Sequence, residues 1–152
     1  MLTHIEQKSL PYSSEQMFAL VAAVDKYKEF APWCVGSRIN KRESETVFYA
    51  DLIVGYKMFR ERFSSKVIIN KAEADKPAEI YIEYLRGPLK HLKNRWRFIE
   101  EADGSCLIDF SVEFEFKNAA LQGLANLFFQ EVIKRMVDAF EQRARDVYGT
   151  VE

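Results

Sequence analysis

The sequence has few of the residues that build disulfide frameworks, metal sites and strongly charged surfaces. Only two cysteines occur among its 152 residues, and Cys34 and Cys106 lack metal-ligand spacing. We expect both to be reduced, half-buried small hydrophobic residues. The 22 basic and 23 acidic side chains give a formal net charge of −1, which provides no general attraction to nucleic acid. The composition therefore argues against a disulfide-rich scaffold and against a DNA-binding protein.

Motifs for catalysis and for crossing a membrane are also missing. No apolar run approaches the roughly 20 residues that span a bilayer, and no signal or transit peptide is recognisable at the start. There is no glycine-rich phosphate loop, nucleophile elbow or metal-ligand cluster. The two histidines, His4 and His91, lie in segments with strand patterns, where an exposed histidine is more common than a catalytic one. We therefore expect a cytoplasmic, non-enzymatic protein without a metal or a catalytic cofactor.

Aromatic residues, in contrast, are abundant. The chain has 12 phenylalanines, 7 tyrosines and 2 tryptophans, which suits either a dense core or a cavity lined by rings. Composition does not choose between these two. The length predicts a single domain over residues 1–152 that buries about 70% of the surface of its unfolded chain.

The longest predicted element is a helix over residues 119–148, with Asn118 as its N-cap and Gly149 as its C-terminal stop. At 1.5 Å per residue it is roughly 45 Å long, and a domain of this size is only about 40 Å across. The sheet must therefore cover a helix that crosses the whole domain. One apolar row repeats at three- and four-residue steps and a second lies beside it: Leu121, Leu124, Phe128, Val132, Met136, Phe140, Ala144 and Val147, then Phe129, Ile133 and Val137.

The preceding residues predict an antiparallel sheet. A strand over residues 3–10 leads to a short helix capped by Ser13 or Ser14 and to a second short helical turn over 25–30, which ends in a bend at Pro32. Alternating strand patterns follow at 37–43, 46–56, 59–70, 79–85, 90–100 and 108–116. The fold class is thus α+β, with a curved sheet of about six or seven strands wrapped around the C-terminal helix. The space between sheet and helix is either filled by the aromatic rings or left as an elongated apolar pocket.

A basic strand near the end of the sheet allows two interpretations. Lys90, His91, Lys93, Arg95 and Arg97 form a basic row that could be a contact surface for a polyanionic partner. The acidic residues of the next strand, Asp109, Glu113 and Glu115, would face this row across the hairpin. We favour the second interpretation, a solvated strand face with paired charges.

Several segments resemble a known family. YKEFAPWC (27–34), ERFSSKV (61–67), GPL (87–89) with Leu92, Asn94 and WRF (96–98), and AFEQRA (139–144) with Tyr148 and Gly149 look like the coenzyme Q-binding protein family. This family is a branch of the START, or polyketide cyclase-like, superfamily, which has a helix-grip fold. Leu89 departs from the pattern, because the family often has an aromatic residue after Gly-Pro.

The resemblance implies a non-catalytic protein that binds ubiquinone or a related isoprenoid lipid in an apolar cavity, peripheral to the inner membrane. Such a protein would support respiratory electron transfer or quinone biosynthesis. A bacterial branch with nearly the same signature is described as a ribosome-association toxin, which binds the large ribosomal subunit and blocks subunit joining. A polyketide cyclase-like enzyme is a further alternative.

Quinone binding needs apolar surface for the tail, and aromatic rings and hydrogen-bond donors for the head group. Arg62, Asn94 and Tyr81 are the candidate donors, although Arg62 alternates away from Phe63 and needs a bulge to reach inward. The candidate ligand-binding residues are Trp33, Tyr56, Glu61, Arg62, Phe63, Tyr84, Asn94, Trp96, Phe110, Phe114, Phe128 and Val132.

Glu61 is the acidic residue with the most chemical interest. On the apolar face of its strand it would be a buried carboxylate that needs a partner. It could bind a quinone head group or act as an acid in a cyclisation. An ion pair with an arginine of a neighbouring strand is the structural alternative, and we favour it.

Overall fold

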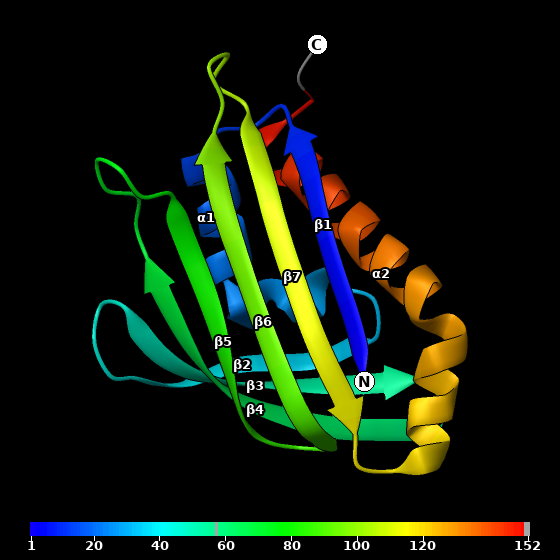
Figure 1. Cartoon of the computed structure of the whole chain (residues 1–152). Coiled ribbons are helices and arrows are strands. Elements are labelled where there is room, and N and C mark those ends of the chain that lie inside the picture. The colour runs from blue at the N-terminus through cyan, green and yellow to red at the C-terminus, as the bar shows by residue number, and fades with distance from the viewer. Residues whose placement is uncertain (57, 151–152) are drawn as a thin grey trace.

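The computed structural model describes residues 1–56 and 58–150, in which seven strands form one antiparallel sheet and three helices lie against one of its faces (Figure 1). The strand order is β1-β7-β6-β5-β4-β3-β2. This arrangement confirms the predicted α+β helix-grip fold. The elements in chain order are β1 (Leu2–Leu10), α1 (Ser14–Ala22), the 3₁₀ helix η1 (Val24–Glu29), β2 (Cys34–Arg42), β3 (Val47–Tyr56), β4 (Phe59–Asn70), β5 (Ala78–Arg86), β6 (Leu89–Glu100), β7 (Cys106–Phe116) and α2 (Ala119–Tyr148).

The ends of the short and the long helix follow from local side-chain chemistry. Ser13 caps α1 in a reciprocal capping box with Gln16, which satisfies two backbone donors. The Asn118 side chain accepts from the first N–H groups of α2, and Gly149, with a φ of 89°, ends it. The bounds predicted for the long helix are therefore confirmed. The strand predicted for residues 37–43 begins earlier, at Cys34.

The core lies between α1, the middle of the sheet and the second half of α2. Phe98 is almost fully buried and meets the ring of Phe18 edge-on, with centroids 5.7 Å apart. Phe140 of α2 packs against the ring of Trp96 at 5.4 Å. Ala144, one turn further along α2, is completely buried. These contacts fasten the C-terminal half of the helix to the sheet.

The first half of α2 is much less buried than its apolar rows suggest. Of the two predicted rows, only Phe129, Ile133, Phe140 and Ala144 are buried. Figure 1 shows that the axis of α2 curves, so that its first turns lie beside the end of β3 and the start of β4. The apolar side chains of these turns face a cavity or solvent.

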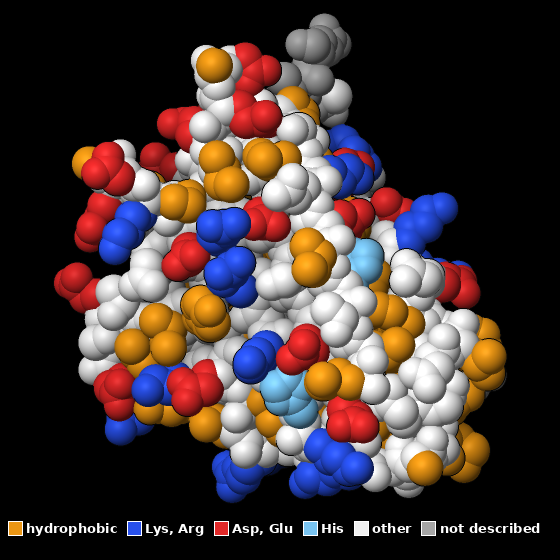
Figure 2. Space-filling view, viewed as in Figure 1, with side chains coloured by type: hydrophobic (Ala, Val, Ile, Leu, Met, Phe, Trp, Pro, Cys, Tyr) orange, Lys and Arg blue, Asp and Glu red, His pale blue; other side chains and the backbone are white. Residues whose placement is uncertain are grey.

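The charged residues on the outer face of β6 and β7 pair with one another. Arg97 and Asp109 are 2.6 Å apart, and His91 and Glu113 are 2.7 Å apart. Figure 2 shows basic and acidic side chains interspersed over these strands. These contacts support the interpretation of the basic strand as a face with paired charges.

Both cysteines are free thiols. Cys106 is completely buried, and burial raises its pKa to about 11. Cys34 is partly buried, and burial raises its pKa as well. Both thiols are therefore protonated, poor nucleophiles at neutral pH.

A buried carboxylate ties β2, β3 and β4 together. Asp51 is 7% exposed, accepts a 2.7 Å hydrogen bond from the Ser64 hydroxyl and lies 3.5 Å from Arg38. Burial raises its pKa, but hydrogen bonds from Ser64 and Asn40 and the nearby positive charges outweigh burial, so that the pKa falls below its usual value. The ionised form therefore stabilises the fold above the usual aspartate pKa of about 3.9, and this stabilisation is lost as the pH falls through the lowered value.

We predict that Ser64→Ala lowers the free energy of unfolding by about 1.5–3 kcal/mol at pH 7, because a hydrogen bond to a charged group is lost. The difference from wild type should be smaller at pH 3 than at pH 7, because protonation of Asp51 removes the charged acceptor. Urea unfolding followed by tryptophan fluorescence at both pH values measures it. Ser65→Ala, on the other face of β4, is the matched control. An equal difference at both pH values would contradict the role of the Asp51 charge.

Candidate ligand-binding cavity

The largest cavity described lies under the first half of α2 and has a volume of about 300 Å³. We name it the outer cavity. Its sheet side consists of Trp33, Val54, Tyr56, Phe59, Phe114 and Phe116. Its helix side consists of Leu121, Leu124, Ala125, Phe128, Phe129 and Val132, with Glu131 and Arg135 as the charged members of the wall. The outer cavity is therefore a mostly apolar space between α2 and the ends of β3 and β7 and the start of β4.

Trp33 occupies a backbone conformation that a bulky residue rarely adopts. Its φ is 62°, in the left-handed region, and no other non-glycine residue in the described ranges has a positive φ. Its carbonyl accepts a 2.8 Å hydrogen bond from the Gly55 N–H, and its ring lies 6.3 Å from that of Tyr56. These contacts hold the indole in the cavity wall at a conformational cost, a combination that is common at binding sites.

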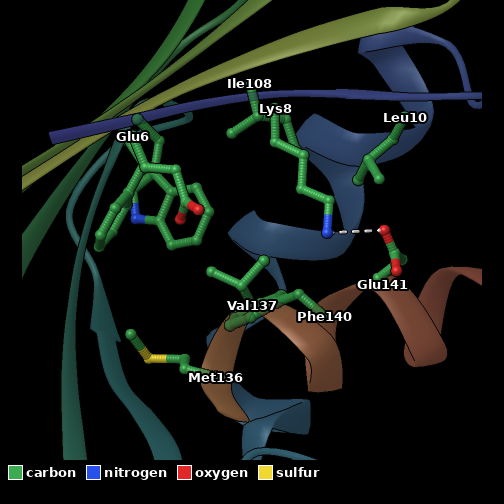
Figure 3. A pocket seen from close by; sticks show the side chains of 10 residues that line it. Glu6, Lys8, Leu10, Ile108, Met136, Val137, Phe140 and Glu141 are labelled. Atoms are coloured by element: carbon green, nitrogen blue, oxygen red, sulfur yellow. Dashed lines mark ion pairs between the residues drawn. The ribbon is translucent and has the colours of Figure 1, made fainter. Parts of the chain in front are cut away.

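A second, inner cavity lies further along the inner side of α2 and has a volume of only about 40 Å³. Trp96, Ile108, Phe110, Met136, Val137 and Phe140 form most of its wall. Figure 3 shows Glu6, Lys8 and Glu141 at its border, with Lys8 Nζ 3.0 Å from Glu141 Oε1. The inner cavity has room for little more than a water molecule.

The ring of Phe129 forms the buried part of the outer cavity wall. It packs against Phe114 at 5.3 Å and against the ring of His4 at 6.0 Å. The two cavities lie along the same helix, because α2 residues 121–135 line the outer one and residues 136–141 line the inner one.

Seven of the twelve candidate binding residues line one of the two cavities. Trp33, Tyr56, Phe114, Phe128 and Val132 line the outer cavity. Trp96 and Phe110 line the inner one. The other candidates, Glu61, Arg62, Phe63, Tyr84 and Asn94, are in neither wall.

Tyr84 and Asn94 are engaged in local hydrogen bonds. The Tyr84 hydroxyl accepts from the Leu89 N–H at 3.0 Å, and a Cβ on Gly87, which has a φ of 148°, would lie only 2.8 Å from this hydroxyl oxygen. Glycine is required there because the turn passes so close to the ring. Asn94 donates to the Ser111 carbonyl at 2.9 Å and accepts from the indole N–H of Trp96 at 3.2 Å, which orients that ring.

Glu61 and Arg62 lie on opposite faces of β4. Glu61 is paired with Val54, a residue of the outer cavity, and is partly buried. In residues 1–56 and 58–150 no ion pair of Glu61 is found, so the favoured arginine partner is not present there. Arg62 is exposed, and the pairing of β4 with β3 continues without a shift through this residue, so no bulge turns it inward.

The inner face of β1 carries ionisable side chains, which the sequence patterns did not predict. His4, Glu6 and Lys8 point toward α2, whereas Ile5 between them is 71% exposed. This is the reverse of the usual alternation, in which apolar residues face the core. The regular spacing of three ionisable side chains, at every second position of an edge strand, is the signal that could have predicted this face.

The sequence of this chain matches a known protein family. Residues 10–141 match the profile of the family described as "Polyketide cyclase / dehydrase and lipid transport". The chain belongs to this family.

Among residues 1–56 and 58–150 no group of histidine, cysteine, aspartate and glutamate side chains could hold a metal ion. No helix in the same ranges combines the length and hydropathy that crossing a bilayer would need.

Two groups of relatives are similar over nearly the whole chain. It is 37% identical to the mitochondrial coenzyme Q-binding protein homolog B of Xenopus laevis over 99% of its length, but it spans only 61% of that protein. It is 31% identical to the ribosome association toxin of Pseudomonas aeruginosa, with 98% of this chain and 100% of the toxin covered. The predicted resemblance to both branches is therefore confirmed.

Solved structures agree with the fold. An 18 kDa protein of Caulobacter crescentus, known from a solution structure, is 34% identical with a TM-score of 0.75, over 99% of this chain and all of that one. The Zhui aromatase/cyclase of a Streptomyces species has a TM-score of 0.81 at 14% identity, with 99% of each chain covered. At that identity the second comparison shows the fold alone.

Proposed function

We propose that this protein binds ubiquinone or a related isoprenoid lipid in the outer cavity and carries it without chemical change. The observation that carries the proposal is an apolar space of about 300 Å³, walled by aromatic and aliphatic side chains. Pockets for small molecules have volumes of about 300–1,000 Å³ and mostly apolar walls with a few polar groups. The outer cavity is at the lower end of this range, so it suits a head group and the first part of a tail.

The energetics of the cavity favour an apolar ligand. Each Å² of apolar surface removed from water contributes about 25 cal/mol, and most of the cavity wall is apolar. Glu131 and Arg135 pair with each other at 2.9 Å, so their charges are matched and offer no free ion to an anionic substrate. The wall thus supports a lipid better than a charged metabolite.

A respiratory role is supported by the names of relatives. Coenzyme Q-binding proteins of Xenopus laevis and Drosophila melanogaster are 37% and 33% identical to this chain. Because the chain spans about three fifths of each, their activity is a proposal for this protein. On this basis the bound lipid would support respiratory electron transfer or quinone biosynthesis.

The polyketide cyclase alternative has less support. Its best acid, Glu61, is in neither cavity wall, and burial protonates both thiols. The similarity to an aromatase/cyclase carries no catalytic residue at 14% identity. We therefore propose a binding protein and not an enzyme.

The mouth of the outer cavity suits contact with an anionic bilayer. Met58 is fully exposed and Leu127 is 77% exposed, and each directly precedes a residue of the outer cavity wall, Phe59 and Phe128. Figure 2 shows hydrophobic side chains gathered over the lower part of α2. Other exposed residues of β4, of the turn before α2 and of α2 itself are basic: Arg60, Arg62, Lys117 and Lys134. Apolar side chains that insert and cations that meet lipid phosphates are what peripheral attachment requires. We propose a cytoplasmic protein peripheral to the inner membrane.

One vesicle experiment tests both parts of the proposal. The protein is mixed with phosphatidylglycerol vesicles that contain ubiquinone, and flotation and transfer of quinone to the unbound protein are both measured. We expect Val132→Trp, which fills the outer cavity, to reduce quinone transfer about tenfold because overpacking costs about 1–3 kcal/mol. Flotation of this variant should not change.

Leu127→Glu is the complementary variant, because Leu127 is outside the cavity wall. It should weaken flotation about tenfold, since burial of a leucine side chain is worth about 1.5–3 kcal/mol. Wild-type protein that takes up no quinone would refute the carrier function. Equal transfer by wild type and Val132→Trp would show that the quinone site lies outside the outer cavity. Unchanged flotation of Leu127→Glu would refute the proposed membrane contact.

Ribosome association is the second candidate, because several bacterial relatives are named ribosome association toxins at 31–32% identity. In that role the protein would bind the large subunit and block subunit joining. The basic strand β6 would be the contact surface for the ribosome, but His91 and Arg97 of this strand already contact carboxylates of β7.

Sucrose gradients of cells that overexpress the protein test this candidate. Ribosome association predicts accumulation of free subunits and co-sedimentation of the protein with the large one. If the protein is only a lipid carrier, the ribosome profile of cells that overexpress wild type should match that of cells that overexpress Val132→Trp. The protein should then stay at the top of the gradient.

A further inference from the structure

The ring of His4 lies beside one aromatic ring from each cavity wall. His4 is on the inner face of β1, opposite Val112 of β7. Its ring centroid is 6.3 Å from that of Phe110, which lines the inner cavity, and 6.0 Å from that of Phe129, which lines the outer one. Its side chain is only 17% exposed. His4 is thus a mostly buried neighbour of both cavity walls.

The Nε2 atom of His4 is buried and makes no hydrogen bond with any residue in the described ranges. Glu6 Oε2 lies 3.5 Å away, within ion-pair range, but not in hydrogen-bonding geometry. A buried polar atom without a partner costs free energy, and native proteins rarely retain one without a reason. A ligand group that supplied the missing partner would recover this free energy on binding.

We propose that His4 Nε2 is the polar anchor of the lipid site and donates a hydrogen bond to a carbonyl oxygen of the ligand. The inference rests on the proposed lipid-binding function. The ligand would enter the outer cavity, turn the Phe129 ring aside and join the two spaces at His4. Imidazole with its proton on Nε2 is a donor, and a ring carbonyl is the acceptor that an isoprenoid quinone offers.

This geometry also orients the ligand. His4 lies behind Phe129, whereas the exposed Leu124 and Phe128 are on the helix side of the outer cavity. A carbonyl-bearing head held by His4 therefore leads into the protein, and the tail trails toward the mouth. The outer cavity then needs to hold only the first part of the tail, so lipids with different tail lengths should bind alike.

The two histidines make the wild-type protein its own control. His91 is on the outer strand face, 2.7 Å from Glu113, and is the only other histidine in the sequence. Long-range ¹H–¹⁵N spectra of the imidazole rings are recorded while decylubiquinone is added. We expect the His4 Nε2 signal to move and the His91 signals to stay in place. Quinone binding that leaves the His4 signal unmoved would overturn the proposal.

Binding by variants separates an anchor from a structural residue. His4→Phe should raise the Kd for decylubiquinone about tenfold, which corresponds to about 1.4 kcal/mol, and should leave the Kd for decylbenzene unchanged. His4→Gln, whose amide can donate, should retain most of the affinity. His91→Phe, on the outer strand face, should bind both ligands like wild type.

Each other outcome contradicts a specific step. Equal loss for decylubiquinone and decylbenzene in His4→Phe would make His4 a packing residue. A His91→Phe variant that loses as much affinity as His4→Phe would show that the loss is not specific to His4. Wild-type protein that binds neither compound would refute the proposed function, and the anchor with it. Binding by wild type that His4→Phe leaves intact would refute the anchor alone.

Discussion

The packing of Phe140 is the interaction on which the rest of the structure depends. Its ring is surrounded by those of Tyr27 at 5.3 Å, Phe30 at 5.2 Å and Trp96 at 5.4 Å, which come from η1, the bend after it and β6. The Tyr148 hydroxyl adds a hydrogen bond to the Gln16 carbonyl on α1. These ties fix the second half of α2 and leave the first half to roof a cavity. A helix fastened at one end can cover a space that a fully packed helix would fill.

This asymmetry joins fold and function. If both halves of α2 were packed into the core, the apolar rows would leave no room for a ligand. Here Leu124 and Phe128 line the outer cavity while remaining about half exposed. Burial of this exposed apolar surface releases free energy only when a lipid tail or a bilayer binds to it. The same residues thus explain the space, its apolar character and the exposed mouth.

The elements that sequence predicts well are those whose causes are local. The ends of α2 follow from Asn118 and Gly149, and the β6–β7 pairing follows from charges at alternate positions. What sequence could not predict depends on long-range contacts. Periodicity is equally apolar in both halves of α2, so it does not tell which half is packed. The inward turn of His4 depends on β1 being an edge strand under α2, and the role of Tyr84 depends on a turn that only Gly87 permits.

The lipid content of the natural protein tests the central claim most directly. The protein is purified from its own host without detergent, its lipids are extracted, and isoprenoid compounds are quantified by mass spectrometry against an unrelated protein purified in the same way. We predict that ubiquinone or a related isoprenoid lipid is enriched and approaches one molecule per chain. An extract without any isoprenoid lipid, from protein that also fails to take up added quinone, would contradict it.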